Sequence, residues 1–264
     1  MRPNDLPETT SASQLSTYAA CPRKYAYRYV ERRDPERHSP ALALGSSVHT
    51  AIAWWFEARS RGEGPSLEDA ARIVRADLGA ALSAREYTWD KEAPAELEAS
   101  ADKLVRAFLD AHGSLRVIDS EVPFEMQIID PDTGEHLRRT LIGYLDLELE
   151  SGNFIELKTA KRSYSDNDVQ VGLQFAAYRT LARYHGVDLE LVALIRTKTA
   201  KVQHLLLPHD CAVSEWFMRA AAHIERAIEA GHFPPAPGMS CSACEYRRAC
   251  LGSAAEPVHA KTAA

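Results

Sequence analysis

The sequence predicts an α/β fold in which a mixed central β-sheet, flanked by helices, follows an N-terminal helical part. Up to about residue 113, apolar residues recur at helical spacing in Ala-rich stretches. From Leu115 the pattern changes to alternation with a period of two, and strand-like and helix-like segments then mix around one sheet. At 264 residues, the chain can bury one good core.

Helices are expected in the first part of the chain. Ser11 and Gln14 have the form of a capping box that opens a helix, and Pro22 predicts a kink or a break into two short helices. Charged and Pro- or Gly-containing stretches at 31–42 and 62–66 are typical of connectors. Further helices are expected over about 44–59, 67–83 and 94–112.

Strands and helices mix after Leu115. A strand over 115–129 contains Pro123, which predicts a bulge or an edge position. The segment DPDTG predicts a turn at 130–134. We then expect a hairpin over about 141–158, a helix over 168–185 ended by Gly186, strands over 189–197 and 202–208, a helix over 211–230, and an irregular cysteine-bearing end.

The register of the hairpin can be argued from its leucines. In LIGYLDLELESGNFIELKTAK, leucines alternate with other residues, so the leucine-rich face should be buried on both strands. Directly opposed residues share a face, which predicts that Leu147 lies opposite Leu157. That register requires a three-residue loop at 151–153, in which Gly152 can adopt a positive φ.

This register gathers three polar residues on the other face. It places Asp146 opposite Lys158, with Glu156 two residues along the same strand. Two carboxylates and a lysine can support metal-assisted phosphodiester hydrolysis, because carboxylates hold divalent ions and the lysine balances charge at the reacting phosphate. The alternative is an amphipathic hairpin whose acidic face is only solvated.

The cysteines form a second constellation. Three of them have the spacing C-x2-C-x5-C near the C-terminus, close enough for one metal centre, and a remote cysteine is the obvious fourth ligand. Thiolates suit zinc or an iron–sulfur cluster, and the spacing does not separate the two. The alternative is a small knuckle of unpaired cysteines. The four residues are Cys21, Cys241, Cys244 and Cys250, and we expect Cys211 to be a plain thiol.

Bulk properties narrow the function classes. The net charge of −6 gives no bulk affinity for nucleic acid, so DNA binding would need a local basic surface. No apolar run approaches the ~20 residues of a membrane span, and the N-terminus has no signal-peptide core, so we expect a cytoplasmic protein with no membrane partner. Without a GxxxxGK[ST] phosphate loop, the chain is not itself an ATP-driven motor.

Six segments, taken in order, resemble a known family. The chain is similar to the PD-(D/E)XK nuclease superfamily, specifically its RecB-like exonuclease branch, which includes the AddB nuclease domain and the CRISPR adaptation exonucleases. The first acid lies in GYLD without the Pro-Asp of the superfamily's motif, a variant usual in this branch. The matching segments are SQLSTYAACPRKYAYRYV, GSSVHTA with His49, GYLDL with Asp146, IELKT with Glu156 and Lys158, QFAAY with Gln174 and Tyr178, and CSACEYRRAC.

The resemblance implies a restriction-endonuclease-like core and two metal centres. In the first, Mg²⁺ or Mn²⁺ would be held by His49, Asp146, Glu156 and the carbonyl of Leu157, while Lys158 would orient or deprotonate the attacking water. In the second, the four cysteines would hold a 4Fe-4S cluster, with zinc as the alternative occupant. The cluster would join the two ends of the chain.

Other residues are candidates for contacts with the substrate or the metal. Gln174 and Tyr178 lie at i and i+4 on one helical face and would contact DNA near the site. Arg23 and Lys24 are interleaved with tyrosines, which suits a single-stranded nucleic-acid track, and the alternative is a solvated helix face. Glu121, on the preceding strand, is a candidate for an additional acid facing the metals.

The resemblance also implies an organisation and an activity. We expect flexible tails at 1–12 and 253–264 around one nuclease domain at 13–252. The expected activity is that of a metal-dependent DNA exonuclease acting on single strands or DNA ends, with a possible helicase or recombination partner. The alternatives are a non-catalytic DNA-binding or complex-assembly subunit, and a zinc-bound structural protein. The expected parts of the domain are a helical part at 13–113, a catalytic core at 114–232 and a cluster-binding segment at 233–252.

Overall fold

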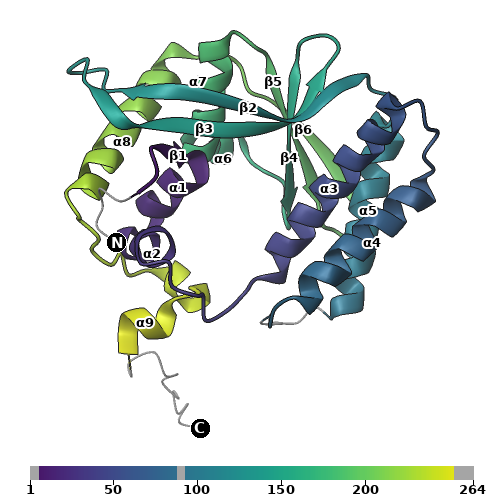
Figure 1. Ribbon diagram of the computed structural model, residues 1–264, viewed down its shortest axis with the longest axis horizontal. Coiled ribbons are helices and arrows are strands. Elements are labelled where there is room, and N and C mark those ends of the chain that lie inside the picture. The colour runs from purple at the N-terminus through teal and green to yellow at the C-terminus, as the bar shows by residue number, and fades with distance from the viewer. Residues whose placement is uncertain (1–5, 88–92, 253–264) are drawn as a thin grey trace.

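The computed structural model describes residues 6–87 and 93–252, and it confirms the predicted α/β fold with N-terminal helices (Figure 1). Its mixed, six-stranded sheet has the order β1-β3-β4-β5-β6, with β2 paired to β3. Parallel pairing joins β1 to β3 and β4 to β5, and the other pairs are antiparallel. The strands are β1 (Thr9–Ser11), β2 (Val117–Ile129), β3 (His136–Leu149), β4 (Phe154–Ala160), β5 (Leu189–Ile195) and β6 (Lys201–Leu206).

The helices lie mostly where the sequence predicts them. Pro22 does divide the first helical segment, because it begins a second short helix directly after Cys21. The described part also contains a π-helical segment, Ala26–Val30, and a 3₁₀ segment, Met239–Ala243. The α-helices are α1 (Ala12–Ala20), α2 (Pro22–Tyr25), α3 (Pro40–Ser60), α4 (Leu67–Ser83), α5 (Pro94–His112), α6 (Asp166–Val171), α7 (Leu173–His185), α8 (Cys211–Glu229) and α9 (Arg247–Leu251).

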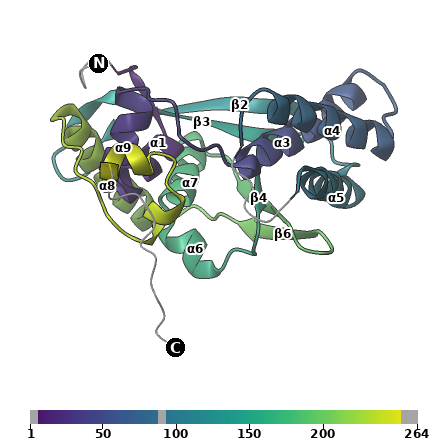
Figure 2. The same cartoon turned by 90° about the horizontal axis from the view of Figure 1, so that it is seen from below.

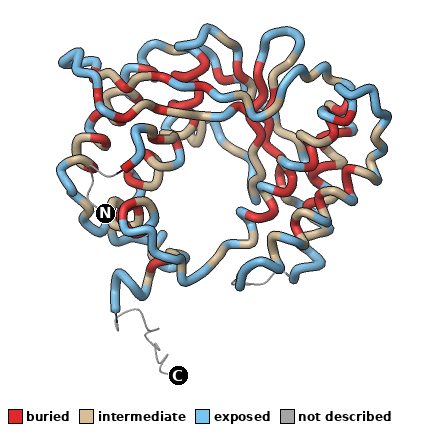
Figure 3. The backbone as a smooth tube through the Cα atoms, in the orientation of Figure 1, coloured by how far each residue is buried: buried red, intermediate tan, exposed pale blue. Residues whose placement is uncertain are grey.

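Two apolar cores pack against the sheet. One is shared by α1, α7, α8 and the sheet, and the other by α3, α4, α5 and the sheet. Strand β4 contributes to both, because Phe154 belongs to the first core while Ile155 and Leu157 belong to the second. Figure 3 shows how the buried residues follow the strands between the two groups of helices.

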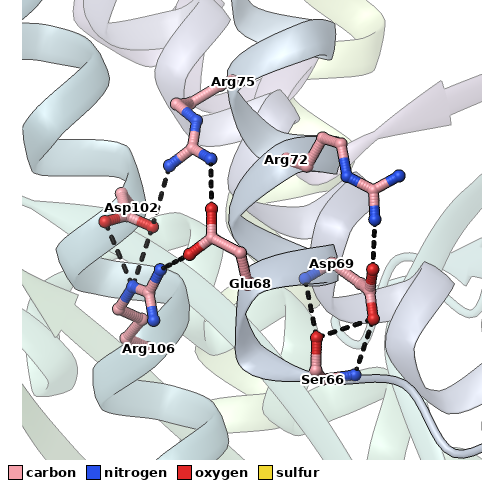
Figure 4. A network of polar contacts seen from close by, with 7 residues as sticks. All are labelled: Ser66, Glu68, Asp69, Arg72, Arg75, Asp102 and Arg106. Carbon is pink, nitrogen blue, oxygen red and sulfur yellow. Dashed lines mark hydrogen bonds and ion pairs between the residues drawn. The ribbon is translucent and has the colours of Figure 1, made fainter.

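Ion pairs on the surface join α4 to α5 (Figure 4). Glu68 accepts from Arg75 at 2.7 Å and from Arg106 at 2.7 Å, and Arg106 also bonds Asp102 on its own helix at 3.0 Å. A capping box between Ser66 and Asp69 begins α4. These groups are partly or largely exposed, so water screens their attraction and the apolar face of the helices dominates their packing.

The N-terminal segment departs from the predicted tail. Leu6 is buried, and Thr9–Ser11 pair with β3 as strand β1. The backbone amide of Thr140 donates to the Glu8 carbonyl at 2.9 Å. The expected tail therefore includes a strand that closes one edge of the sheet, while residues 1–5 and 253–264 lie outside the described part.

The predicted single helix over 168–185 is wrong, because it is two helices separated at Gly172. A Cβ at this position would lie 2.6 Å from the Asp168 carbonyl oxygen and 2.7 Å from the Phe175 ring. Only glycine allows this close turn, which ends α6 and begins α7. The predicted end at Gly186 is confirmed, with a left-handed φ of +69°.

The predicted register of the hairpin is also wrong. Leu147 pairs with Ile155, not with Leu157, and Glu148 pairs with Phe154. The amide of Leu149 donates to the Asn153 carbonyl at 2.9 Å, and the intervening loop uses Gly152 at a φ of +81°. Alternation decides only which face a residue occupies, and a shift of two residues leaves every face unchanged.

Strand β2 confirms the predicted edge position of Pro123. Among the described strands, β2 pairs with β3 alone. An edge strand tolerates a proline, which has no N–H to donate to a second neighbour. The DPDTG segment forms the turn between β2 and β3, with Gly134 at a φ of +73°. None of the helices in the described part is long and apolar enough to cross a membrane.

Candidate active site and cysteine pocket

Asp146 on β3 is held by two hydrogen bonds. Its Oδ1 accepts from His49 Nδ1 at 2.9 Å, and its Oδ2 accepts from the Leu157 amide at 2.6 Å. Burial opposes its ionisation, but the hydrogen bonds from His49 and the Leu157 amide, together with the charges of His49 and Lys158, lower the pKa of Asp146 below its ordinary value. A carboxylate can only accept a hydrogen bond, so the imidazole proton lies on Nδ1. The Nε2 of His49 then has a lone pair that can ligate a metal.

Helix α3 explains the spacing of Gly45 and His49. The two residues are one turn apart, on the same face of the helix. A Cβ at Gly45 would lie only 3.1 Å from Thr159 Oγ1, so α3 passes close to the end of β4 at this position. Glycine at this position allows the close approach that brings His49 to Asp146.

Glu156 and Lys158 form a buried ion pair on β4. Lys158 Nζ donates to Glu156 Oε1 at 2.5 Å and lies 3.3 Å from the Tyr178 hydroxyl. Burial raises the pKa of Glu156 to about 7. Burial alone would lower the pKa of Lys158, but the charge and hydrogen bond of Glu156, together with the charges of Tyr178 and Asp146, raise this pKa above its ordinary value.

Helix α7 places Gln174 and Tyr178 beside this pair. Gln174 Nε2 is 3.5 Å from the Tyr178 hydroxyl, at the limit of a hydrogen bond. Burial raises the pKa of Tyr178 above its ordinary value, so its hydroxyl stays protonated. The structure thus brings six of the predicted residues into one connected group, which comprises His49, Asp146, Glu156, Lys158, Gln174 and Tyr178.

The donor set suits a divalent cation. Glu156 is 3% exposed, and its Oε2 is buried without a hydrogen-bond partner in the described part of the chain. A buried acceptor is rarely left unpaired, and a hard cation prefers such carboxylate oxygens. In their present positions, no three His, Cys, Asp or Glu side chains of the described residues are close enough to enclose an ion. The residue types suit a divalent cation, and the unpaired Oε2 of Glu156 is a candidate ligand for it.

Three predicted residues lie apart from this group. Arg23 stacks over the Tyr27 ring at 4.3 Å, and Lys24 pairs with Glu245 at 2.8 Å, so both belong to the cysteine-bearing region. Tyr27 is 3% exposed and offers no ring face to a base. Glu121 is exposed on β2 with a φ of +54°, and no hydrogen bond or ion pair connects it to the site among the described residues.

The four predicted cysteines line one cavity of about 50 Å³. None of them forms a disulfide. Arg23, Lys24 and Tyr246 also line it, and burial raises the pKa of the Cys244 thiol. Soft sulfur donors around one cavity fit zinc or an iron–sulfur cluster in kind, although the described thiols do not converge closely enough to hold a metal as they stand. Cys211 is exposed at the start of α8, far from this set in the chain.

Backbone contacts bring the two ends of the chain together at this cavity. The amide of Arg23 donates to the Pro234 carbonyl at 3.1 Å, and the amide of Glu36 donates to the Glu245 carbonyl at 2.8 Å. The Glu36 carboxylate accepts from the first amides of α9, those of Arg248 and Ala249, at 3.0 and 2.7 Å. Figures 1 and 2 place α9 at the end of the molecule that holds α1 and α2, away from α3–α5.

The sequence analysis missed Arg139, which is fully buried on β3. It pairs with Glu225 of α8 at 3.2 Å and donates to the Thr9 carbonyl at 2.6 Å, to Gln14 Oε1 at 2.8 Å and to the Tyr25 hydroxyl at 3.1 Å. The signal in the sequence is its place between Leu137 and Leu141, on the buried side of the alternating strand. Arg139 fastens the segment that carries Cys21 to the sheet.

Comparison with a solved structure supports the fold. A solved structure of a candidate exonuclease from Eubacterium rectale is 13% identical, with a TM-score of 0.56, and the match covers 97% of this chain and 91% of that one. A structure named SSO0001 is 14% identical over 94% of this chain and 87% of that one, and its TM-score of 0.46 is too low to support an argument. No curated protein matches the chain.

The family model extends over nearly all of the chain. Residues 9–251 match the model of the PD-(D/E)XK nuclease superfamily. The match includes both strands of the hairpin, the helices that carry His49 and Tyr178, and all four cysteines of the cavity. The chain therefore belongs to the PD-(D/E)XK nuclease superfamily.

Proposed function

We propose that this protein is a metal-dependent DNA exonuclease of the RecB-like branch, acting on single strands or DNA ends. The observation that carries the proposal is the buried Glu156 carboxylate, whose Oε2 has no described hydrogen-bond partner and which lies beside Lys158 and Asp146. An acid with a raised pKa in such a position is a common feature of catalytic centres.

In this proposal, Asp146, Glu156, the Leu157 carbonyl and His49 hold Mg²⁺ or Mn²⁺. The ion would supply a water of lowered pKa and would offset the charge that grows on the phosphate. Lys158 keeps its proton because of Glu156, so it donates to the attacking water or to a phosphate oxygen and does not act as the base. Gln174 and Tyr178 would position the adjacent phosphate from α7.

The cysteine cavity has a structural role in this proposal. A 4Fe-4S cluster held by Cys21, Cys241, Cys244 and Cys250 would lock the two ends of the chain together, with zinc as the alternative occupant. Residues 13–252 would form one nuclease domain. A helicase or recombination protein would supply single strands or ends during DNA repair, recombination, phage DNA metabolism or CRISPR adaptation.

The test is degradation of end-labelled single-stranded DNA by anaerobically purified protein with Mn²⁺ or Mg²⁺. Asp146→Ala should reduce the rate by about 10³-fold, because several kcal/mol of transition-state stabilisation are lost with a metal ligand. Asp119→Ala, at an exposed site on β2, is the matched control and should keep full activity. Intact DNA with folded wild-type protein would favour a DNA-binding or assembly subunit instead.

A further inference from the structure

An arginine at the cysteine cavity carries a buried donor that no described group accepts. Arg247 lines the cavity together with the four cysteines. Its Nε is buried without a hydrogen-bond partner, and no ion pair engages its guanidinium among residues 6–87 and 93–252. A guanidinium keeps its charge and can only donate hydrogen bonds, and buried donors are rarely left unpaired. The Nε–H therefore calls for an acceptor that the described chain does not supply.

The two other cationic side chains among the described lining residues are already engaged by acids. Lys24 pairs with Glu245 at 2.8 Å, and Arg23 pairs with Glu31 at 3.3 Å. The Glu36 carboxylate, which reaches the start of α9, accepts from backbone amides of that helix. The positive charge of Arg247 is therefore the one on this wall that no described acid balances.

The backbone holds Arg247 beside two of the proposed cluster ligands. Its amide donates to the Cys244 carbonyl at 3.3 Å, and the Cys250 amide donates to the Tyr246 carbonyl at 3.0 Å. Tyr246 is buried and packs against Tyr27, with 5.5 Å between the ring centroids. Arg247 thus belongs to the same short, anchored segment that carries Cys244 and Cys250, and it lies three residues from each of them.

A metal centre held by four thiolates is an anion. Each thiolate carries a negative charge, and together they outweigh the positive charge of an iron–sulfur core. A positive charge and an N–H donor on the wall stabilise such an anion. They stabilise its reduced form more, because reduction adds a further negative charge. Nearby charge and hydrogen bonds to the sulfur atoms are accordingly among the factors that set the reduction potential of a cluster.

We propose that Arg247 donates its Nε–H to a sulfur atom of the 4Fe-4S cluster and raises the reduction potential of that cluster. The inference rests on the proposed cluster and does not depend on DNA cleavage. It gives the C-terminal segment a second role, because the segment that supplies three of the thiolates also supplies a charge that balances them.

The test is a redox titration of anaerobically purified protein, with dithionite as the electron donor and visible absorbance as the readout. Arg247→Gln should keep its iron and shift the midpoint potential to a more negative value. A tenfold loss in the equilibrium constant for uptake of one electron corresponds to about 59 mV. Arg247→Lys, which keeps the charge and loses the guanidinium, should lie between this variant and the wild type. Arg248→Gln, a matched loss of an exposed arginine that does not line the cavity, should leave the potential unchanged.

Iron and zinc analysis, together with melting temperatures, accompanies each titration. A wild-type potential in Arg247→Gln with full iron content would overturn the inference. If Arg247→Gln loses its iron, Arg247→Lys decides, and a wild-type potential in that variant overturns the inference. Equal shifts in Arg247→Gln and Arg248→Gln would show a general effect of surface charge and would also overturn it. Wild-type protein that holds zinc and no iron would overturn the cluster and this inference together, while DNA degradation by the same preparation would still test the nuclease.

Discussion

The candidate metal site and the cysteine cavity are held in place in different ways. At the metal site, hydrogen bonds link the side chains to each other and to the sheet, as in His49 to Asp146 and Leu157 to Asp146. At the cavity, backbone amides contact the thiols of Cys241 and Cys244, as in the 3.4 Å hydrogen bond from the Gly238 amide to Cys241 Sγ. The thiols are brought together by the backbone segments that carry them.

This difference matters for the two metal centres that we propose. The sheet and α3 form the first site before any ion binds, so removal of Mg²⁺ or Mn²⁺ should leave the fold intact. The cavity joins segments from the two ends of the chain through a few backbone contacts, so a cluster there would add stability that those contacts do not provide.

The largest effect is expected when the N-terminal segment is released from the sheet. Arg139→Met leaves Glu225 buried without its partner and should reduce the free energy of unfolding by about 3–5 kcal/mol. Chemical denaturation measures this loss. Arg138→Met, which removes a partly exposed pair with Glu229, is the matched control and should change stability by about 1 kcal/mol or less. Equal losses in the two variants would show that the buried network does not hold the segment.

Loss of one cysteine should affect the cysteine cavity and leave the candidate metal site unchanged. Cys21→Ser should lower the iron content and the visible absorbance, and it should reduce the melting temperature by roughly 5–10 °C if about 2–3 kcal/mol of binding energy is lost. Mn²⁺ binding by the folded protein should be unchanged. Cys211→Ser, at an exposed thiol outside the cavity, should alter none of these properties. Unchanged melting in Cys21→Ser would contradict the idea that the cavity joins the chain ends.

Metal binding at the candidate metal site should depend on pH in the range below neutrality. The pKa of Glu156 is raised to about 7, and a cation binds only the deprotonated form. Below pH 7 the ion must displace a proton, so Mn²⁺ affinity should fall about tenfold per pH unit and should level off above pH 7. Calorimetric titration of metal-free protein between pH 5.5 and 8.5 measures this. If Glu156→Gln retains the same slope, another group is responsible.

The local elements could be predicted from the sequence because their signals lie within a few residues. Ser66 begins α4 and Gly186 ends α7 by capping and by positive φ, and both act on their own turn. Pro123 could be assigned to an edge for the same kind of reason. The break at Gly172 was missed because it depends on how closely Phe175 and the Asp168 carbonyl approach, which the helical pattern of the sequence does not contain.

The sequence predicted which strand residues of the candidate site share a face, and it did not predict their geometry. Alternation along two strands placed Asp146, Glu156 and Lys158 on one face, and this holds in the structure. The register that the leucines predicted was wrong by two residues, because such a shift preserves every face. Strand β4 packs into both cores, so its register depends on contacts with distant helices that the alternation along the hairpin does not contain.

By itself, the sequence determined the fold class, most element boundaries and the residue types that gather at each site, because these depend on periodicity, capping and donor chemistry. Only the tertiary structure decided how α3 reaches Asp146, why Arg139 is buried, and which arginine of the C-terminal segment lines the cysteine cavity. Those features join residues that are far apart along the chain. Their energies depend on close packing and on burial of charge, which no local pattern records.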